Sequence, residues 1–362
     1  MIVKGVPIGA DDMKKHYKIG LCGHLNSDAV GENGQTVRTN NIKKQLLKHY
    51  GENAVYCVST HNWKRKPVSL LISILKMCVK SEAVILFPNT RSIKTILPFC
   101  VSLKKLLKTR VYYNVIGAWL PRILDEKKWL KRYVKKLDAL FIQTDTLQQQ
   151  LKERGIEKTV IFPNFKELNC VEEKETERIF DSPLPVCFFS RVTEKKGVED
   201  AINAVNRINA DGIKLSLDIY GPVDENYKSR FNQIMKEAPE YIKYKGVVEN
   251  TKTPEILKDY FVQVFPTHYP TEGHPGSLID SLYAALPVVA ARWNSCNDVV
   301  FENETGITYE FGSLDDLILK LQYCIEHQAE INEMRPKCVE YAKRYSPEEV
   351  MKRLYDVIDF AK

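Results

Sequence analysis

The chain has 362 residues, enough for two domains of ordinary size, and 44% of them are hydrophobic. No run reaches the roughly 18 apolar residues that a membrane-spanning helix needs, and the first residues show no signal-peptide core or cleavage site. The composition therefore excludes an integral membrane protein and predicts a soluble cytoplasmic protein. Nine cysteines occur without a C-x-x-C pair or a metal-spaced histidine, which predicts reduced cysteines in the core and no metal site.

The charge divides the chain into two halves. Residues 1–165 contain 29 basic and 12 acidic residues, a balance of +17, whereas the remainder has a balance of −10. Opposite signs suggest two domains with different partners. A basic half suits an anionic membrane face or nucleic acid, but the second is disfavoured because no basic motif is interleaved with aromatic residues.

The first half alternates apolar strand patterns with helical patterns, which predicts a parallel sheet covered on both faces. The predicted strands are 17–22, 54–59, 83–87, 110–116, 139–144 and 158–162, and the predicted helices are 40–50, 68–79, 93–107, 127–136 and 146–154. A glycine-bearing loop with Gly31 and Gly34 separates the first strand from its helix, a geometry that suits approach to a phosphate. Its spacing matches neither a dinucleotide fingerprint nor a P-loop.

Helix 127–136 is basic over most of its circumference. Its cations are Lys127, Lys128, Lys131, Arg132, Lys135 and Lys136. Trp129 and Leu130 beside them form an expected apolar anchor for a lipid surface. A solvated helix face explains the same pattern equally well.

A charged, apolar-poor segment at 166–183 predicts the linker, and the alternation then restarts. The predicted strands are 186–189, 215–220, 242–245, 261–265 and 288–291, and the predicted helices are 198–209 and 228–238, one between the last two strands, and two that begin near Asp315 and Pro347. The domains are therefore expected at 1–165 and 184–343, with a C-terminal helix in 344–362 that returns to the first domain.

The stretch from Pro266 to Ala290 follows a predicted strand at 261–265, so residues 261–291 read as strand, loop, helix and strand, and the loop carries Glu272 to a helix N-terminus. Unpaired amide groups at such a terminus suit a phosphate or a sugar hydroxyl. The alternative is local: Ser277-x-x-Asp280 matches a helix capping box, and Glu272 is then only a solvated charge.

Arg191 and Lys196 flank a loop after strand 186–189, where doubly wound sheets bind ligands. An arginine fork and a lysine point charge together suit a diphosphate. Ordinary surface basicity is the alternative for either residue alone.

With these motifs, the chain resembles the retaining glycosyltransferases of family 4, which have the GT-B fold. Glu272 to Pro287 resembles the family's Glu-x7-Glu segment and Gly-x-Pro-Val, residues 190–197 its Gly-Arg-Leu…Lys-Gly, and Pro163-Asn164 the end of its first domain. Residues 33–39, 115–121 and Arg292-Trp293-Asn294 resemble a bacterial branch that builds capsules and other cell-envelope polysaccharides.

The resemblance implies a fold and a set of roles. The fold is two Rossmann-like, doubly wound parallel-sheet domains that face a central cleft. Arg191 and Lys196 would hold the diphosphate, Glu272 would address the transferred sugar, and Asp280 would bind the ribose. The remaining implied donor residues are Gly31, Gly34, Gly273, His274, Gly276 and Ser277, and the implied acceptor-side residues are Gly117 and Trp119. The family works without a metal or another cofactor, on a donor linked to UDP or GDP.

Four positions depart from the family pattern. Asp280 is one methylene shorter than the usual glutamate, and Pro275 removes one amide donor from the loop. Ala285 stands where a helix-ending glycine is usual, so a positive φ there would cost roughly 1 kcal/mol. No histidine follows strand 110–116, and His24 on the glycine loop is the nearest candidate by sequence.

The resemblance predicts transfer of a sugar, with retention, from a nucleotide diphosphate to a hydroxyl. The expected acceptor is a lipid-linked oligosaccharide or polysaccharide, reached by a cytoplasmic enzyme that binds peripherally to the inner, anionic face of a bacterial membrane. The alternative is a catalytically silent sugar-nucleotide-binding subunit that supports a partner transferase. Measuring nucleotide release separates the two.

Overall fold

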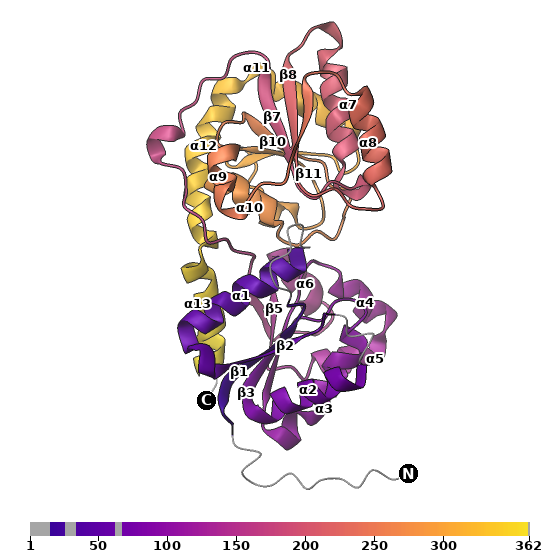
Figure 1. Ribbon diagram of the computed structural model, residues 1–362, viewed down its shortest axis with the longest axis vertical. Helices are drawn as coiled ribbons and strands as arrows, with labels where there is room; N and C mark the ends of the chain where they lie inside the picture. The colour runs from indigo at the N-terminus through magenta and orange to yellow at the C-terminus, as the bar shows by residue number, and fades with distance from the viewer. Residues whose placement is uncertain (1–14, 26–33, 62–66, 361–362) are drawn as a thin grey trace. The chain divides into compact units, whose positions relative to one another are not determined.

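The computed structural model describes residues 15–25, 34–61 and 67–360 of the chain. It divides into two compact units, each described here by itself (Figure 1). Unit 1 contains the described residues within Met1–Gln143, Leu147–Phe162 and Met351–Lys362, and unit 2 contains Thr144–Thr146 and Pro163–Val350. Each unit is built on a six-stranded sheet in which neighbouring strands run parallel. The predicted α/β class with two doubly wound domains is confirmed.

Unit 1 has the strand order β2-β1-β3-β4-β5-β6. Its elements are β1 (Tyr17–Gly23), α1 (Gly34–Tyr50), β2 (Val55–Ser59), α2 (Pro67–Lys80), β3 (Ser81–Leu86), α3 (Ile93–Leu107), β4 (Arg110–Asn114), α4 (Leu120–Glu126), α5 (Lys128–Val134), β5 (Ala139–Ile142), α6 (Asp145–Lys152), β6 (Thr159–Ile161) and the greater part of α13 (Pro347–Phe360). The central strands are continuous apolar runs because both of their faces are covered. Helix α4 was not predicted.

Helices α2 to α6 share one apolar cluster with alternate residues of these strands. Helices α1 and α13 lie side by side within unit 1 (Figure 1). The hydroxyl of Tyr355 on α13 donates to the backbone oxygen of Gln45 at 3.1 Å, and the hydroxyl of Tyr50 donates to Asp359 at 3.1 Å. Helix α13 is thus held against α1 by side chains of both helices.

The basic helix predicted at 127–136 is shorter in the structure, where α5 covers only Lys128–Val134. Leu130 is completely buried in the apolar cluster, so its predicted role in an exposed anchor was wrong. The periodicity of the sequence did not show which side of this short helix faces the sheet. Trp129 is 41% exposed, and Leu106 on the neighbouring α3 is 78% exposed.

Unit 2 has the strand order β12-β11-β10-β7-β8-β9. Its elements are β7 (Leu184–Phe189), α7 (Val198–Ile208), β8 (Leu215–Tyr220), α8 (Lys228–Glu237), β9 (Ile242–Gly246), α9 (Thr253–Leu257), β10 (Val262–Phe265), α10 (Gly276–Tyr283), β11 (Val288–Ala291), β12 (Gly306–Tyr309), α11 (Leu314–Glu326) and α12 (Gln328–Ala342). Helices α7, α8 and α11 share one large apolar cluster, and α10 shares another with α12. The chain adds strands in one direction from β7 to β9 and in the opposite direction from β10 to β12. The carboxyl ends of β7 and β10 therefore form the switch point where doubly wound folds bind ligands.

The segment 166–183, predicted as a linker, packs on unit 2 in the structure. Leu168 and Cys170 join the cluster of α10 and α12, and the amide of Val171 donates to the backbone oxygen of Tyr283 at 3.0 Å. A short 3₁₀ helix at Glu173–Glu175 carries Glu175, which pairs with Lys258 at 2.7 Å. Some of the charged residues that led to the prediction of a linker therefore form ion pairs with other residues of unit 2.

Ala285, just after α10, has φ of +53°, as the missing glycine suggested, whereas its neighbour Ala284 has φ of −88°. Both side chains are completely buried, so replacing either by glycine removes a buried methyl group and adds the same freedom to the unfolded chain. Only Ala285→Gly also relieves the left-handed conformation, which costs an alanine roughly 1–2 kcal/mol. We therefore expect Ala285→Gly to be more stable than Ala284→Gly by about that amount in urea unfolding. Equal losses in the two variants would contradict the assigned strain.

Candidate functional site

Two loops of unit 2 meet at the switch point of its sheet. One follows β7 and contains a 3₁₀ turn at Glu194–Lys196. The amide of Lys196 donates to the side chain of Thr193 at 3.2 Å and so closes this turn. The other follows β10 and leads to α10. Gly197 allows them to meet, because it has φ of +74° and an added Cβ would lie 1.8 Å from the backbone oxygen of Pro266. The sequence placed both loops at carboxyl ends of strands, and the sheet order makes them neighbours.

Lys196 and Glu272 face each other across these loops. The ammonium of Lys196 forms an ion pair with Oε1 of Glu272, and the hydroxyl of Thr267 donates to the same oxygen at 3.1 Å. The two charged side chains are only 18% and 14% exposed. Glu272 is therefore not a solvated loop charge, and a residue 76 positions away in the sequence holds its carboxylate in place.

Aromatic rings enclose the ammonium of Lys196. It lies 5.3 Å from the ring centre of Phe265 and 5.4 Å from that of Tyr269, within the range of cation–π attraction. Burial raises the pKa of Tyr269, the Glu272 carboxylate raises it further, and the Arg191 guanidinium opposes both. Tyr269 thus belongs to the same electrostatic cluster as the predicted Arg191, Lys196 and Glu272. Sequence reasoning missed it, although it lies in the loop already singled out.

Asp280 is buried in α10, with its side chain 3% exposed. The ammonium of Lys166 donates to its Oδ2 at 3.0 Å, and the hydroxyl of Thr253 donates to its Oδ1 at 3.0 Å. The alternative capping box is wrong: α10 begins at Gly276, Pro275 occupies the N-cap position, and no side chain caps the helix. The predicted ribose contact of Asp280 stays a prediction for a carboxylate whose two oxygens already accept hydrogen bonds.

Lys166 was missed because it follows Pro163-Asn164 at the start of the predicted linker. A Cβ added to Gly276 would lie 3.4 Å from Cε of Lys166 and 3.4 Å from Nδ2 of Asn164, so this glycine lets the segment approach the start of α10. The Asn164 amide also donates to the backbone oxygen of His274 at 3.5 Å. A lysine directly after the Pro-Asn pair was the available signal in the sequence.

The other predicted donor residues of unit 2 line the loop and the start of α10. Gly273 is buried. His274 is only 4% exposed, and its ring centre lies 4.5 Å from that of Tyr345. Ser277 is half-buried, and its backbone oxygen accepts from the hydroxyl of Ser281 at 3.2 Å.

The predicted unit 1 residues that the structure describes are Gly34, Gly117 and Trp119. Gly117 has φ of +80°, and its amide donates to Oε1 of Gln143 at 2.7 Å. Trp119 is half-buried, and its indole N–H donates to the backbone oxygen of Ile116 at 2.7 Å. Gly34 begins α1, and an added Cβ there would meet no described atom within 4 Å. Gly31 lies outside the described residues.

His24 also belongs to unit 1. Its Nδ1 lies 2.9 Å from the hydroxyl of Thr36, and its Nε2 lies 3.2 Å from Nδ1 of His61. Within the described ranges, no group of three or more His, Cys, Asp or Glu side chains is arranged to hold a metal ion.

With this geometry established, residues 171–345 match the family model described as "Glycosyl transferases group 1". The match covers slightly less than half of the chain, so this part of unit 2 is similar to the group 1 glycosyl transferases. The matched region contains the Lys196–Glu272 pair and Asp280. Among curated proteins, the GtfA subunit of the UDP-N-acetylglucosamine–peptide N-acetylglucosaminyltransferase of Streptococcus agalactiae is 29% identical over 166 residues. This alignment covers 46% of the chain and 30% of the length of that relative.

Solved structures resemble the whole chain. The Anabaena protein HepE, determined in complex with UDP, aligns over 95% of this chain and 100% of its own, with a TM-score of 0.72 and 14% identity. Sucrose-phosphate synthase from Thermosynechococcus elongatus covers the same shares with a TM-score of 0.73 and 12% identity. These likenesses confirm the GT-B fold that the sequence resemblance implied. The group 1 match together with this fold supports a glycosyltransferase.

Proposed function

We propose that the protein is a retaining glycosyltransferase that moves a sugar from UDP to a hydroxyl of a lipid-linked or polysaccharide acceptor in the synthesis of a bacterial surface glycan. The observation that carries this proposal is the Lys196–Glu272 pair at the switch point of unit 2, in the region that matches the group 1 model. The choice of UDP is supported by HepE, whose structure was determined with UDP and with UDP-glucose.

Each proposed role follows from a side chain of unit 2. A nucleoside diphosphate leaving group gains negative charge as its bond to the sugar breaks, and nearby cations stabilise that charge. Lys196 and Arg191 supply the cations, and a donor diphosphate would draw the Lys196 ammonium away from Glu272. The carboxylate of Glu272 is then released to accept hydrogen bonds from hydroxyls of the transferred sugar. Thr267 keeps it oriented throughout.

The proposal is tested by two measurements on the full chain. UDP at a hundredfold its Kd should stabilise the protein by about 2.7 kcal/mol, whereas the same concentration of uridine should not. UDP should be released from UDP-glucose or UDP-N-acetylglucosamine when a bacterial extract of polyisoprenyl-linked oligosaccharides is added. Glu272→Gln should retain the stabilisation by UDP and lose this release. Absence of stabilisation by every nucleoside diphosphate would refute a sugar-nucleotide site.

A second candidate is the silent subunit that binds a sugar nucleotide and supports a partner transferase. It is favoured by one observation: the loop after β4 offers Ile116, Gly117, Ala118 and Trp119, none of which can transfer a proton from a side chain at neutral pH. The solved structures that resemble the chain include a GtfA/B complex, at 15% identity and a TM-score of 0.61. Stabilisation by UDP without release of UDP under any condition would support this candidate.

A lipid-linked acceptor would require the protein to reach a membrane surface. No helix among the described residues is both long and apolar enough to cross a bilayer. Unit 1 instead presents exposed cations along and beside α5, together with Trp129 and Leu106. Each basic residue near an anionic surface contributes about 1 kcal/mol, and salt screens this attraction.

We therefore expect the protein to sediment with vesicles that contain anionic lipid, not with neutral ones, and to be released by high salt. Charge reversal at Lys128 and Arg132, both exposed on α5, should abolish sedimentation and leave stabilisation by UDP unchanged. In the matched control variant, the charges of Lys236 and Lys243, two exposed cations of unit 2, are reversed. This variant should sediment with the anionic vesicles like the wild type. If the wild type ignores anionic vesicles at low salt, a water-soluble acceptor replaces the lipid-linked one.

A further inference from the structure

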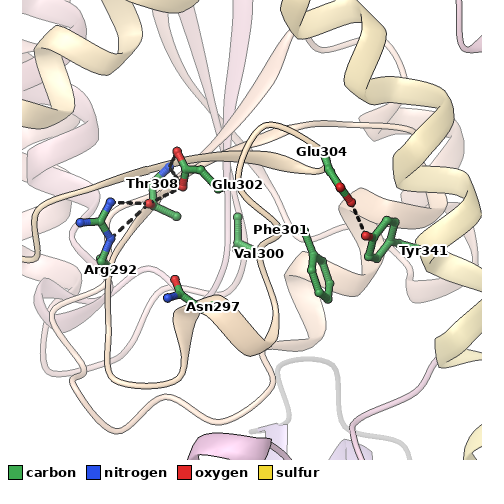
Figure 2. A pocket seen from close by; sticks show the side chains of 8 residues that line it. All are labelled: Arg292, Asn297, Val300, Phe301, Glu302, Glu304, Thr308 and Tyr341. Atoms are coloured by element: carbon green, nitrogen blue, oxygen red, sulfur yellow. Dashed lines mark hydrogen bonds between the residues drawn. The ribbon is translucent and has the colours of Figure 1, made fainter.

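A cavity of about 680 Å³ opens in unit 2 between the segment that follows β11 and helix α12 (Figure 2). Its volume lies in the range of small-molecule sites. Arg292, of the Arg292-Trp293-Asn294 motif, is one of its lining residues. The lining includes none of the residues that are assigned above to the donor. Trp293 of that motif is buried against Phe265, with ring centres 5.6 Å apart. This packing fixes the backbone after β11, and the neighbouring Arg292 lines the cavity.

One wall of the cavity is a polar network held in a fixed orientation. Nε and Nη2 of Arg292 donate to the hydroxyl of Thr308 at 3.3 and 2.8 Å. This hydroxyl donates to Oε2 of Glu302 at 2.5 Å, and the Thr308 amide donates to both Glu302 oxygens at 3.2 and 3.1 Å. Because Thr308 is only 1% exposed, both charged groups are attached to the buried part of β12. Asn297 adds an exposed amide below them in Figure 2.

The other wall is aromatic. The rings of Phe301 and Tyr341 lie 4.3 Å apart at 42°, and both residues are half-buried. The hydroxyl of Tyr341 donates to the carboxylate of Glu304, and the guanidinium of Arg344 lies 4.0 Å from the centre of the Tyr341 ring. These partners fix the Tyr341 ring, so the cavity combines an immobilised apolar side with an immobilised polar side.

We propose that this cavity binds a neutral sugar ring of a glycan chain, as a second sugar site lined by other residues than the donor site. The C–H face of a pyranose is apolar and suits an aromatic wall, whereas its neighbouring hydroxyls need donors and acceptors held in place. Arg292 and Asn297 donate, and Glu302 accepts. An anionic sugar is disfavoured because Glu302 and Glu304 carry like charge. Pre-oriented side chains lose little entropy when the ligand binds. That the ligand belongs to a glycan chain rests on the proposed function. The existence of a sugar-binding cavity does not depend on that function.

Saturation-transfer NMR on the full chain tests the site, with saturating UDP present to occupy the donor site. The probes are methyl α-glucopyranoside and methyl N-acetyl-α-glucosaminide, with methyl α-glucuronide as the anionic comparison. We expect signals from the neutral probes and a weaker one, or none, from the glucuronide. Arg292→Gln should raise the Kd of the neutral probes at least about tenfold, because it removes a charge-assisted donor.

Asn297→Ala provides a second variant in case Arg292→Gln unfolds, and it should raise the same Kd. Lys236→Gln, which removes an exposed cation of α8 outside the cavity, should leave it unchanged. The proposal is overturned if neither neutral probe gives a signal, or if both cavity variants bind the neutral probes with the wild-type Kd. It is also overturned if the glucuronide binds more tightly than the neutral probes. No readout requires sugar transfer, so an inactive transferase that binds the probes would refute the proposed function and leave this site standing.

Discussion

Lys196→Ala is expected to lower the turnover of sugar transfer by about 10²- to 10³-fold and to leave the fold intact. Removing one group that stabilises a developing charge typically costs about 3–4 kcal/mol in the transition state. Lys196 is the cation nearest to such a role, because it is 18% exposed, pairs with Glu272 and lies against the rings of Phe265 and Tyr269. The measurement is kcat and KM for UDP release, with circular dichroism and thermal unfolding to verify the fold.

Lys195→Ala is the matched control for this experiment. Lys195 is the adjacent residue and is exposed, and its ammonium lies 5.8 Å from the centre of the Tyr269 ring on the same loop. Among the described residues, it is Lys196, not Lys195, that forms the ion pair with Glu272. We expect its turnover to stay within about threefold of the wild type, as for most exposed substitutions. Near-normal turnover in Lys196→Ala, or an equal loss in both variants, would remove Lys196 from the proposed mechanism.

Lys166→Met should destabilise unit 2 by about 3 kcal/mol. The substitution keeps the apolar stem of the side chain but leaves the Asp280 carboxylate, which is 3% exposed, without its cation. Removing one partner of a buried ion pair typically costs 3–5 kcal/mol because a buried charge is left uncompensated. The remaining hydrogen bond from Thr253 and the 12% exposure of Lys166 place the expected cost at the lower end. A fall of about 6–12 °C in the unfolding temperature corresponds to this loss.

A double-mutant cycle isolates the pair from the packing of the lysine stem. Asp280→Asn removes the negative charge and keeps an oxygen for Thr253, so Lys166→Met combined with Asp280→Asn should recover at least about 1 kcal/mol relative to the sum of the single changes. Lys236→Met on α8 is the control for a methionine at an exposed position and should change stability by less than about 0.5 kcal/mol. Strictly additive losses would show that Lys166 and Asp280 do not interact in solution.

Much of the fold could be predicted because buried parallel strands are short, continuous apolar runs between turn residues. The strands at 215–220 and 288–291 and the helix at 93–107 have the predicted bounds. The missed elements have weak local patterns. Helix α4 is seven residues long with a proline in its first turn, and α12 contains Pro336, which sequence reasoning takes as a helix breaker. Strand β12 has only four residues and begins with a glycine.

The sequence by itself determined that this chain forms two α/β units and that its charged loops lie at carboxyl ends of strands, because both properties follow from local periodicity and from the turn residues that end each strand. Only the tertiary structure decided which loops meet. Lys196 and Glu272 are 76 residues apart, and Lys166 and Asp280 are 114 residues apart. No local pattern encodes such pairs. They form because the sheet order places β7 beside β10, and because buried charges are stable only where the fold supplies an opposite charge.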